Sequence, residues 1–125
     1  MNAPDPKIIA LQFNETINQQ NIRGLTSLMT EDHRFIDRAG LIVSGKNNLT
    51  EAWIRFFELF PEYRNTFTDV KSNGNLIILF GYATWKKGEA PDHVIWTAII
   101  KDDLVAEWRI YEDSEENKEK FKVSE

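Results

Sequence analysis

The sequence contains no cysteine, no long apolar run and no cluster of basic residues. Without cysteine the chain can form no disulfide, no thiolate nucleophile and no cysteine-based zinc site. The longest apolar stretch, residues 76–80, is far too short to span a bilayer. Residues 1–9 lack the basic segment and the apolar run of a secretory signal. These absences lead us to expect a cytoplasmic protein that has no membrane as a partner.

Length and charge narrow the class of protein further. The chain has 125 residues, of which 42% are hydrophobic, and this is typical of one domain with a packed core. We expect a single domain over residues 1–125, with its core at about residues 6–113 and a charged, frayed tail at residues 114–125. The formal net charge is −5, which repels phosphate, so we expect no nucleic acid as a partner.

Two helices are predicted at the start of the chain. Asp5 and Pro6 match an N-cap followed by proline at the first helical position, where a missing N–H does no harm. Apolar residues then recur every four positions, which predicts an amphipathic helix over about residues 6–19. A second, short helix is predicted at residues 22–29, with Asn21 as its cap.

A third helix is predicted after Gly45. Asn48 and Glu51 have the spacing of a capping box, and Pro61 should end the helix because its ring cannot continue the hydrogen-bond ladder. Apolar residues along this segment form one continuous face, which consists of Leu49, Ala52, Trp53, Phe56, Phe57 and Phe60.

Between these helices the pattern changes to a period of two. Residues 33–38 read as a strand that places His33, Phe35 and Asp37 on one side. A short return strand is predicted at residues 41–43, so the two strands form a hairpin.

The second half of the chain reads as strands alone. Asn73 and Gly74 favour a two-residue hairpin of type I′, in which both central residues have positive φ, and residues 101–103 carry a weaker turn signal. Since no helix separates the strands, we expect an antiparallel meander. Its strands are predicted at residues 66–72, 75–85, 93–101 and 104–112.

The fold class is therefore α+β, with about three N-terminal helices packed on a curved antiparallel sheet. A curved sheet with helices across its concave side encloses a cone. Such a cone is a natural pocket for a small ligand.

The order of these elements, with the segments EDHRFIDRAG, GKNNLTEAWIRFFELFPEYR and LVAEWRIYED, resembles the nuclear transport factor 2-like superfamily. Within that superfamily it is most similar to the SnoaL-like polyketide cyclase group, over about residues 6–113. The resemblance implies the cone-shaped fold of that superfamily. It implies no single reaction, since the superfamily contains isomerases, cyclases, epoxide hydrolases, dehydratases and non-enzymatic binding or assembly domains.

Asp37 is the first candidate for a catalytic residue. In the ketosteroid isomerase branch of the superfamily a catalytic aspartate lies on the first strand, shortly before a turn glycine, and Asp37 matches that position. The alternative is a structural turn residue, since aspartate suits the ends of strands. The resemblance places Phe13 and Trp96 where that branch has its two oxyanion-hole donors, which argues against isomerisation by the same mechanism.

His33 and Asp113 are two further candidates. His33 shares a strand face with Asp37 and could exchange a proton with a carboxylate or contact a ligand, or it could be a structural hydrogen-bonding residue. Asp113 resembles the inward acid with which the cyclases take a proton beside a carbonyl group, or it could simply end the last strand.

The last strand alternates between a polar and a mostly apolar face. The resemblance implies that the polar face lines the cone, which would place Arg109, Tyr111 and Asp113 there. A solvated polar face is the alternative. Trp108 and Ile110 would then lie on the outer side of the sheet, through which homodimers of this family commonly pair, so we expect a homodimer.

Our leading hypothesis is a SnoaL-like protein whose apolar cone binds a small, hydrophobic carbonyl compound and acts on it as a cyclase or an isomerase. Asp37 or Asp113 would be the base. One alternative is a ligand-binding or dimeric assembly module without turnover, and a lesser one is an epoxide hydrolase that uses Asp37, Arg109 and Asp113. Metal and phosphate motifs are absent, so we expect no metal and no cofactor. The predicted walls of the cone are Phe13, Trp53, Phe57 and Trp96.

Overall fold

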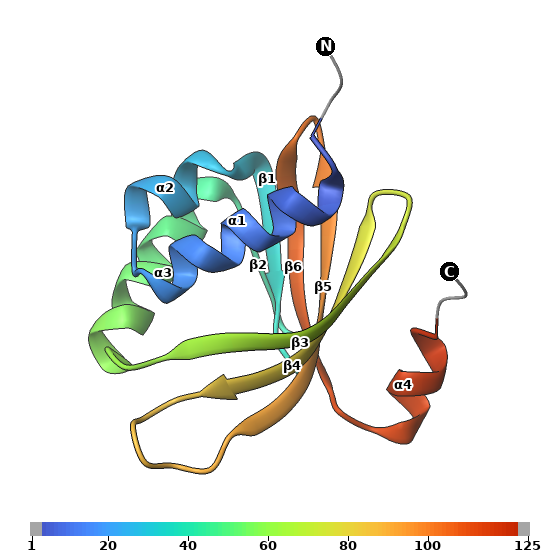
Figure 1. The fold of residues 1–125 in the computed structure, drawn as a ribbon. Helices are drawn as coiled ribbons and strands as arrows, with labels where there is room; N and C mark the ends of the chain where they lie inside the picture. Colours follow the sequence, from blue (N-terminus) through green and yellow to red (C-terminus); the bar gives the residue numbers. More distant parts are fainter. Residues whose placement is uncertain (1–3, 123–125) are drawn as a thin grey trace.

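A curved sheet is the centre of the computed structural model, which describes residues 4–122 (Figure 1). Within those residues the sheet has six strands in the order β2-β1-β6-β5-β4-β3. The strands are β1 Met29–Ile36, β2 Ile42–Ser44, β3 Arg64–Asn73, β4 Leu76–Thr84, β5 Asp92–Lys101 and β6 Leu104–Glu112. The helices are α1 Pro6–Asn18, α2 Ile22–Ser27, α3 Lys46–Leu59 and α4 Glu115–Lys120. The predicted α+β architecture is confirmed, with one more helix than expected.

The first two helices begin as the sequence predicts. The side chain of Asp5 accepts a hydrogen bond from the backbone N–H of Lys7, and Pro6 occupies the first turn of α1. Asn21 caps α2 by accepting from the N–H of Gly24. The predicted end of α2 is wrong, however, because the helix stops at Ser27. Met29 already belongs to β1, where it pairs with β6 and is fully buried.

The predicted capping box of α3 is also wrong. The helix begins at Lys46, directly after Gly45, whose φ of 96° lies in the region that favours glycine. Asn48 is therefore inside the helix, and its side-chain amide donates to the carbonyl of Ser44 instead. The predicted end is confirmed, since α3 ends at Leu59, two residues before Pro61.

Strands β3 to β6 form the predicted antiparallel meander. The sheet as a whole is mixed, which the sequence analysis did not predict, because β1 pairs with β6 in parallel. After the β1–β2 hairpin the chain passes through α3 and the whole meander before β6 returns beside β1. The predicted short return strand is confirmed as β2, which forms one edge of the sheet.

Both predicted hairpin turns are present, but the first is not of the predicted type. Asn73 pairs with Leu76, so Gly74 and Asn75 are the central residues of that turn, and only the first of them has positive φ. That pattern fits a type II′ turn rather than the predicted type I′. Asp102 and Asp103 both have positive φ, as type I′ requires.

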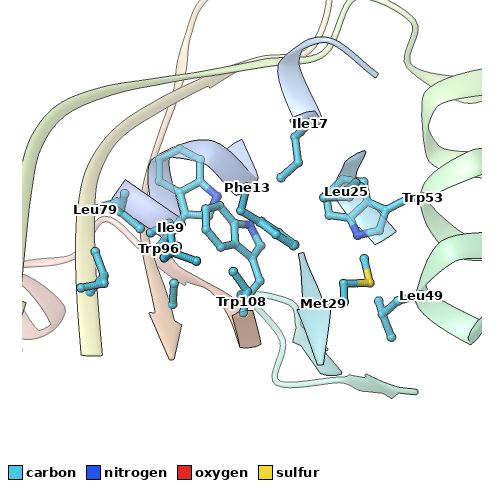
Figure 2. Close-up of a cluster of buried hydrophobic side chains, with 14 of the residues drawn as sticks. Ile9, Phe13, Ile17, Leu25, Met29, Leu49, Trp53, Leu79, Trp96 and Trp108 are labelled. Atoms are coloured by element: carbon cyan, nitrogen blue, oxygen red, sulfur yellow. The ribbon is translucent and has the colours of Figure 1, made fainter. Parts of the chain in front are cut away.

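Helices cover both faces of the central strands. Helix α1 packs against β3 to β6, and α3 packs against β1 and β2. Figure 2 shows the resulting core, in which Ile9 and Phe13 of α1 lie beside Trp96 and Trp108 of the sheet. The predicted frayed tail is wrong over residues 114–122, because Ser114 caps α4 there, while residues 123–125 lie outside the described chain.

The outer face of the sheet carries a smaller core beneath α4. Phe121 at the end of α4 is buried against Ile78 and Ile95, and its ring lies 4.8 Å from that of Tyr111. Strands β4 and β5 are therefore apolar on both faces, as expected for strands that are covered twice. Among residues 4–122, each helix is too short or too polar to cross a membrane.

Candidate functional site

A cavity of about 470 Å³ opens between α3 and the sheet. Its lining residues come from α3 and from β1, β2, β4, β5 and β6, whereas α1 packs on β3 to β6 elsewhere in the core. The cavity is lined by Phe35, Asp37, Arg38, Ala39, Val43, Leu49, Ala52, Trp53, Phe56, Tyr63, Ala83, Trp85, Val94, Trp108 and Ile110. Its size suits a drug-sized or smaller molecule.

Aromatic rings make up much of the cavity wall. Phe56 of α3 packs edge-on against Tyr63 and Trp85, with ring centroids 4.8 and 5.6 Å apart. The ring of Trp53 lies 5.8 Å from Phe35 of β1, also edge-on. The wall is therefore a connected set of rings from one helix and three strand ends, which holds its shape through mutual packing.

Asp37 is a structural residue of the β1–β2 turn and also belongs to the cavity lining. Its Oδ1 accepts hydrogen bonds from the backbone N–H groups of Ala39 at 2.9 Å and Leu41 at 3.0 Å, so the carboxylate shapes the β1–β2 turn. The same side chain is half-buried and lines the cavity. Among residues 4–122, neither backbone nor side chain donates to its Oδ2. One carboxylate oxygen is therefore engaged in the turn, and the other has no hydrogen bond within the described chain.

A network of charged residues extends from Arg38 in the cavity lining. The guanidinium of Arg38, which follows Asp37, donates to Oδ2 of Asp92. The indole N–H of Trp85 donates to the same oxygen at 3.0 Å, and Arg38 also lies 3.7 Å from the carboxylate of Glu112. This network ties the β1–β2 turn to the ends of β4, β5 and β6.

Tyr63 belongs to the cavity lining and carries a neutral hydroxyl. The residue is buried, and burial raises the pKa of its phenol well above the ordinary value, an effect that the side chain of Asn65 partly opposes. The hydroxyl therefore stays protonated at any physiological pH and can donate or accept a hydrogen bond.

His33 lies deeper in the core than the sequence analysis expected. Its ring has 0% exposure and packs 5.5 Å from the ring of Phe13, away from the cavity lining. Nδ1 lies 2.6 Å from the carbonyl oxygen of Val105, so this nitrogen carries the proton, because a carbonyl can only accept. The structure supports the structural interpretation of His33, which joins β1 to β6.

The buried position of His33 predicts a pH dependence of stability. Burial lowers the pKa of His33 from the ordinary 6.5. Just below pH 6.5 the histidine is therefore protonated in the unfolded chain but stays neutral in the folded chain. The stability contributed by the neutral ring is complete above about pH 6.5 and is lost as the pH falls towards the lowered value. His33→Asn retains an N–H near the Nδ1 position. Between pH 7 and pH 5 its free energy of unfolding, measured with urea, should depend less on pH than that of wild type.

His93 gives the matched control for that experiment, because its side chain is exposed at the start of β5. His93→Asn should retain the wild-type dependence of the free energy of unfolding on pH. If the free energy of unfolding of His33→Asn varies with pH as that of wild type does, the pH dependence does not come from the buried ring.

The predicted faces of β6 are reversed. Trp108 is 1% exposed and contacts Phe13, and Ile110 lines the cavity, so both lie on the inner face. A bulge at Ala106 accounts for part of the error, because Ile99 pairs with Glu107 while Ile100 pairs with Val105. The extra residue shifts the alternation by one position.

Arg109, Tyr111 and Asp113 consequently lie outside the cavity. The guanidinium of Arg109 stacks over the ring of Tyr111 at 4.6 Å, on the face that α4 covers. Asp113 follows β6 and forms an ion pair with Lys118 of α4 at 3.6 Å. The epoxide hydrolase set of Asp37, Arg109 and Asp113 is therefore not assembled, and the expectation that these β6 residues line the cone is wrong.

The predicted aromatic walls divide into two groups. Trp53 lines the cavity, whereas Phe13, Phe57 and Trp96 are buried in the core and are not among the lining residues. Trp108 and Ile110, on which the expected dimer surface depended, are inside the cone. Pairing of two copies through the outer face stays a prediction that has lost this support.

Sequence reasoning missed several lining residues. Arg38 follows Asp37 directly, and Tyr63 and Trp85 are aromatic residues beside the ends of β3 and β4. Aromatic residues at strand ends that meet the end of an aromatic helix were a usable signal for this wall. Among residues 4–122, no group of three or more His, Asp or Glu side chains has the arrangement of a metal site.

Comparison with known proteins was made at the level of sequence and of structure. A protein-family model described as SnoaL-like domain matches residues 10–114. A search of curated proteins gave no match to the sequence.

Solved structures with low sequence identity share the fold. A candidate SnoaL-like polyketide cyclase from Shewanella denitrificans is 15% identical, with a TM-score of 0.77 over 87% of this chain and 90% of that chain. A nuclear transport factor 2-like protein of unknown function from Cytophaga hutchinsonii is 12% identical, with a TM-score of 0.74 over 90% and 93%. TerC, co-crystallised with polyporic acid, is 16% identical, with a TM-score of 0.74 over 92% and 97%. The chain thus has the nuclear transport factor 2-like fold.

Proposed function

Because the chain belongs to the SnoaL-like domain family, we propose that its cavity binds a small, largely apolar compound with an aromatic or polycyclic body. The observation that supports this most is the wall of packed rings around an open volume of about 470 Å³. Flat apolar molecules gain both burial and ring–ring contact in such a site. TerC, which has a similar fold, was co-crystallised with polyporic acid.

The direct test is a calorimetric titration with 2-acetylnaphthalene, a flat and neutral aromatic ketone. We expect saturable binding of one molecule per chain, with a negative heat-capacity change, since apolar surface is buried. Quenching of tryptophan fluorescence gives a second readout, because Trp53, Trp85 and Trp108 all line the cavity. A complete absence of binding by both methods would overturn the proposal.

Asp37 favours a second candidate function, the abstraction of a proton beside a carbonyl group. Its free Oδ2 could take a proton from the α-carbon, while the electron pair of the C–H bond moves to the carbonyl oxygen and forms an enolate. Asp37→Asn can still accept the two turn hydrogen bonds through its amide oxygen, so it should leave the fold intact.

The corresponding prediction uses exchange of the acetyl protons of 2-acetylnaphthalene in D₂O, followed by proton NMR. Wild-type protein should accelerate exchange, and Asp37→Asn should reduce that acceleration by about 10²-fold or more, since a positioned base contributes this much. Exchange at the wild-type rate in the variant would remove Asp37 from the role of base. Binding without any exchange would favour a ligand-binding module.

A further inference from the structure

Charge at the cavity mouth is unevenly distributed. Asp37 and Arg38 are the charged side chains among the residues that line the cavity. Arg38 is already paired with Asp92, and Glu112 lies 3.7 Å from its other terminal nitrogen. Two carboxylates therefore offset the charge of the Arg38 guanidinium, whereas Asp37 forms no ion pair within residues 4–122. A ligand in the cavity meets the carboxylate of Asp37 beside an arginine that is already paired.

This arrangement disfavours an anionic ligand. An anion that took the place of Asp92 on Nη2 of Arg38 would compete with a carboxylate whose Oδ2 also accepts from the indole N–H of Trp85 at 3.0 Å. The anion would then leave the Asp92 carboxylate without its partners, close to the second carboxylate of Glu112. Separating such a hydrogen-bonded charge pair is unfavourable, since both partners lose their stabilisation.

The cavity wall suits positive charge instead. The rings of Trp53, Trp85 and Trp108 line it, and indole faces attract organic cations more strongly than other aromatic side chains do. Asp37 is half-buried and belongs to the same cavity lining, and its Oδ2 accepts no hydrogen bond from residues 4–122. Aromatic rings with an adjacent carboxylate are the combination by which proteins recognise ammonium groups.

We propose that the cavity selects ligands that join an apolar aromatic body to a positively charged group, such as an alkylammonium, over neutral and anionic analogues. This inference rests on the proposed binding function and specifies the class of ligand. Asp37 is the counter-ion for the cation, and the pairing of Arg38 with Asp92 keeps the guanidinium from repelling it.

Three probes with one naphthalene body test the inference. They are 2-naphthylmethylammonium, 2-naphthalenemethanol and 2-naphthoate, titrated by calorimetry at pH 7.5 in low salt. We expect the ammonium probe to bind about tenfold more tightly than the alcohol, as cation–π contact and one partly buried charge pair together allow. The carboxylate should bind most weakly of the three. Raising the salt concentration should reduce the advantage of the ammonium probe and leave the alcohol unaffected.

Variants assign the effect to particular charges. Asp37→Asn should remove most of the advantage of the ammonium probe without weakening the alcohol. Arg38→Gln leaves Asp92 and Glu112 unneutralised at the mouth, so it should strengthen binding of the ammonium probe severalfold. Glu119→Gln on α4, on the opposite face of the sheet, makes the same change in net charge as Asp37→Asn and should leave the preference intact.

The outcomes separate the inference from the function on which it rests. Binding of the alcohol or of the carboxylate at least as tight as that of the ammonium probe would overturn the inference and leave the proposed function standing. If none of the three probes binds, both are wrong. An equal loss of ammonium preference in Glu119→Gln and Asp37→Asn would show that overall charge, rather than the cavity, attracts the cation.

Discussion

Replacing Gly81 by alanine is expected to lower the free energy of unfolding by about 3 kcal/mol, a large share of the stability of a domain of this size. Gly81 lies in β4 opposite Phe67 of β3, directly beside an irregularity in the pairing of the two strands. A Cβ at this position would overlap the carbonyl oxygen of Thr66 and lie 2.9 Å from the Cα of Phe67. Both obstacles are backbone atoms, so no side-chain rotation can relieve the overlap.

The same substitution should also affect the cavity. The backbone of β3 comes close to β4 at Gly81, and the two strands pair along their length. Two residues further along β4, Ala83 belongs to the cavity lining, and Trp85 follows just after the strand. A forced separation of β3 from β4 should therefore weaken binding of 2-acetylnaphthalene as well as stability.

Gly88→Ala is the control that separates steric overlap from the conformational freedom of glycine. Gly88 has a φ of 89°, but a Cβ there would meet nothing within 4 Å. Its replacement should lower stability by about 1 kcal/mol through backbone strain alone. Urea unfolding of both variants gives the comparison, and a Gly81→Ala protein no less stable than Gly88→Ala would contradict the close approach of the two strands.

The sequence predicted those elements whose signals are local. Asp5 with Pro6 identified the start of α1, and Pro61 identified the end of α3, because capping and ladder breaking act within a few residues. The meander was predictable because its strands follow one another through short turns. The parallel pairing of β1 with β6 joins segments about 70 residues apart, and no local pattern encodes it.

The faces of β6 show a second limit of prediction from the sequence. A polar and an apolar face were evident from alternation, but which face meets the helices depends on the rest of the molecule. The inner face turned out to be apolar, with Trp108 beneath α1, and the bulge at Ala106 removed the simple alternation. Helix α4 then covers Tyr111 on the outer face, which a charged tail gave little reason to expect.

Of the candidate site residues, Asp37 and Trp53 lie in the cavity lining. Both were identified by a strong feature, the position of an aspartate before a turn and the apolar face of a helix. Arg38, Tyr63 and Trp85 were missed because their importance comes from the meeting of strand ends, where the network of Arg38 with Asp92 forms. A site composed of strand ends is largely a product of tertiary structure.

Filling the cavity with Ala83→Phe is expected to weaken binding of 2-acetylnaphthalene tenfold or more, equivalent to at least about 1.4 kcal/mol. Ala83 is 1% exposed, lies in the cavity lining and pairs with Asn65 and Asp92 on the neighbouring strands. A phenyl ring at this position can occupy open volume and pack against the aromatic wall. Stability should therefore stay within about 1 kcal/mol of wild type, or rise, as cavity-filling substitutions often allow.

The combination of retained stability and lost binding is what distinguishes a ligand site from a packing defect. Ala90→Phe, in the exposed β4–β5 loop outside the lining, makes the same chemical change and should retain full affinity. Calorimetric titration gives the affinity and urea unfolding the stability of each variant. If Ala83→Phe binds the ketone as wild type does, the ligand lies elsewhere, and if it unfolds the protein, the space beside Ala83 is smaller than the cavity requires. Either result would end the argument that this cavity is where the domain acts.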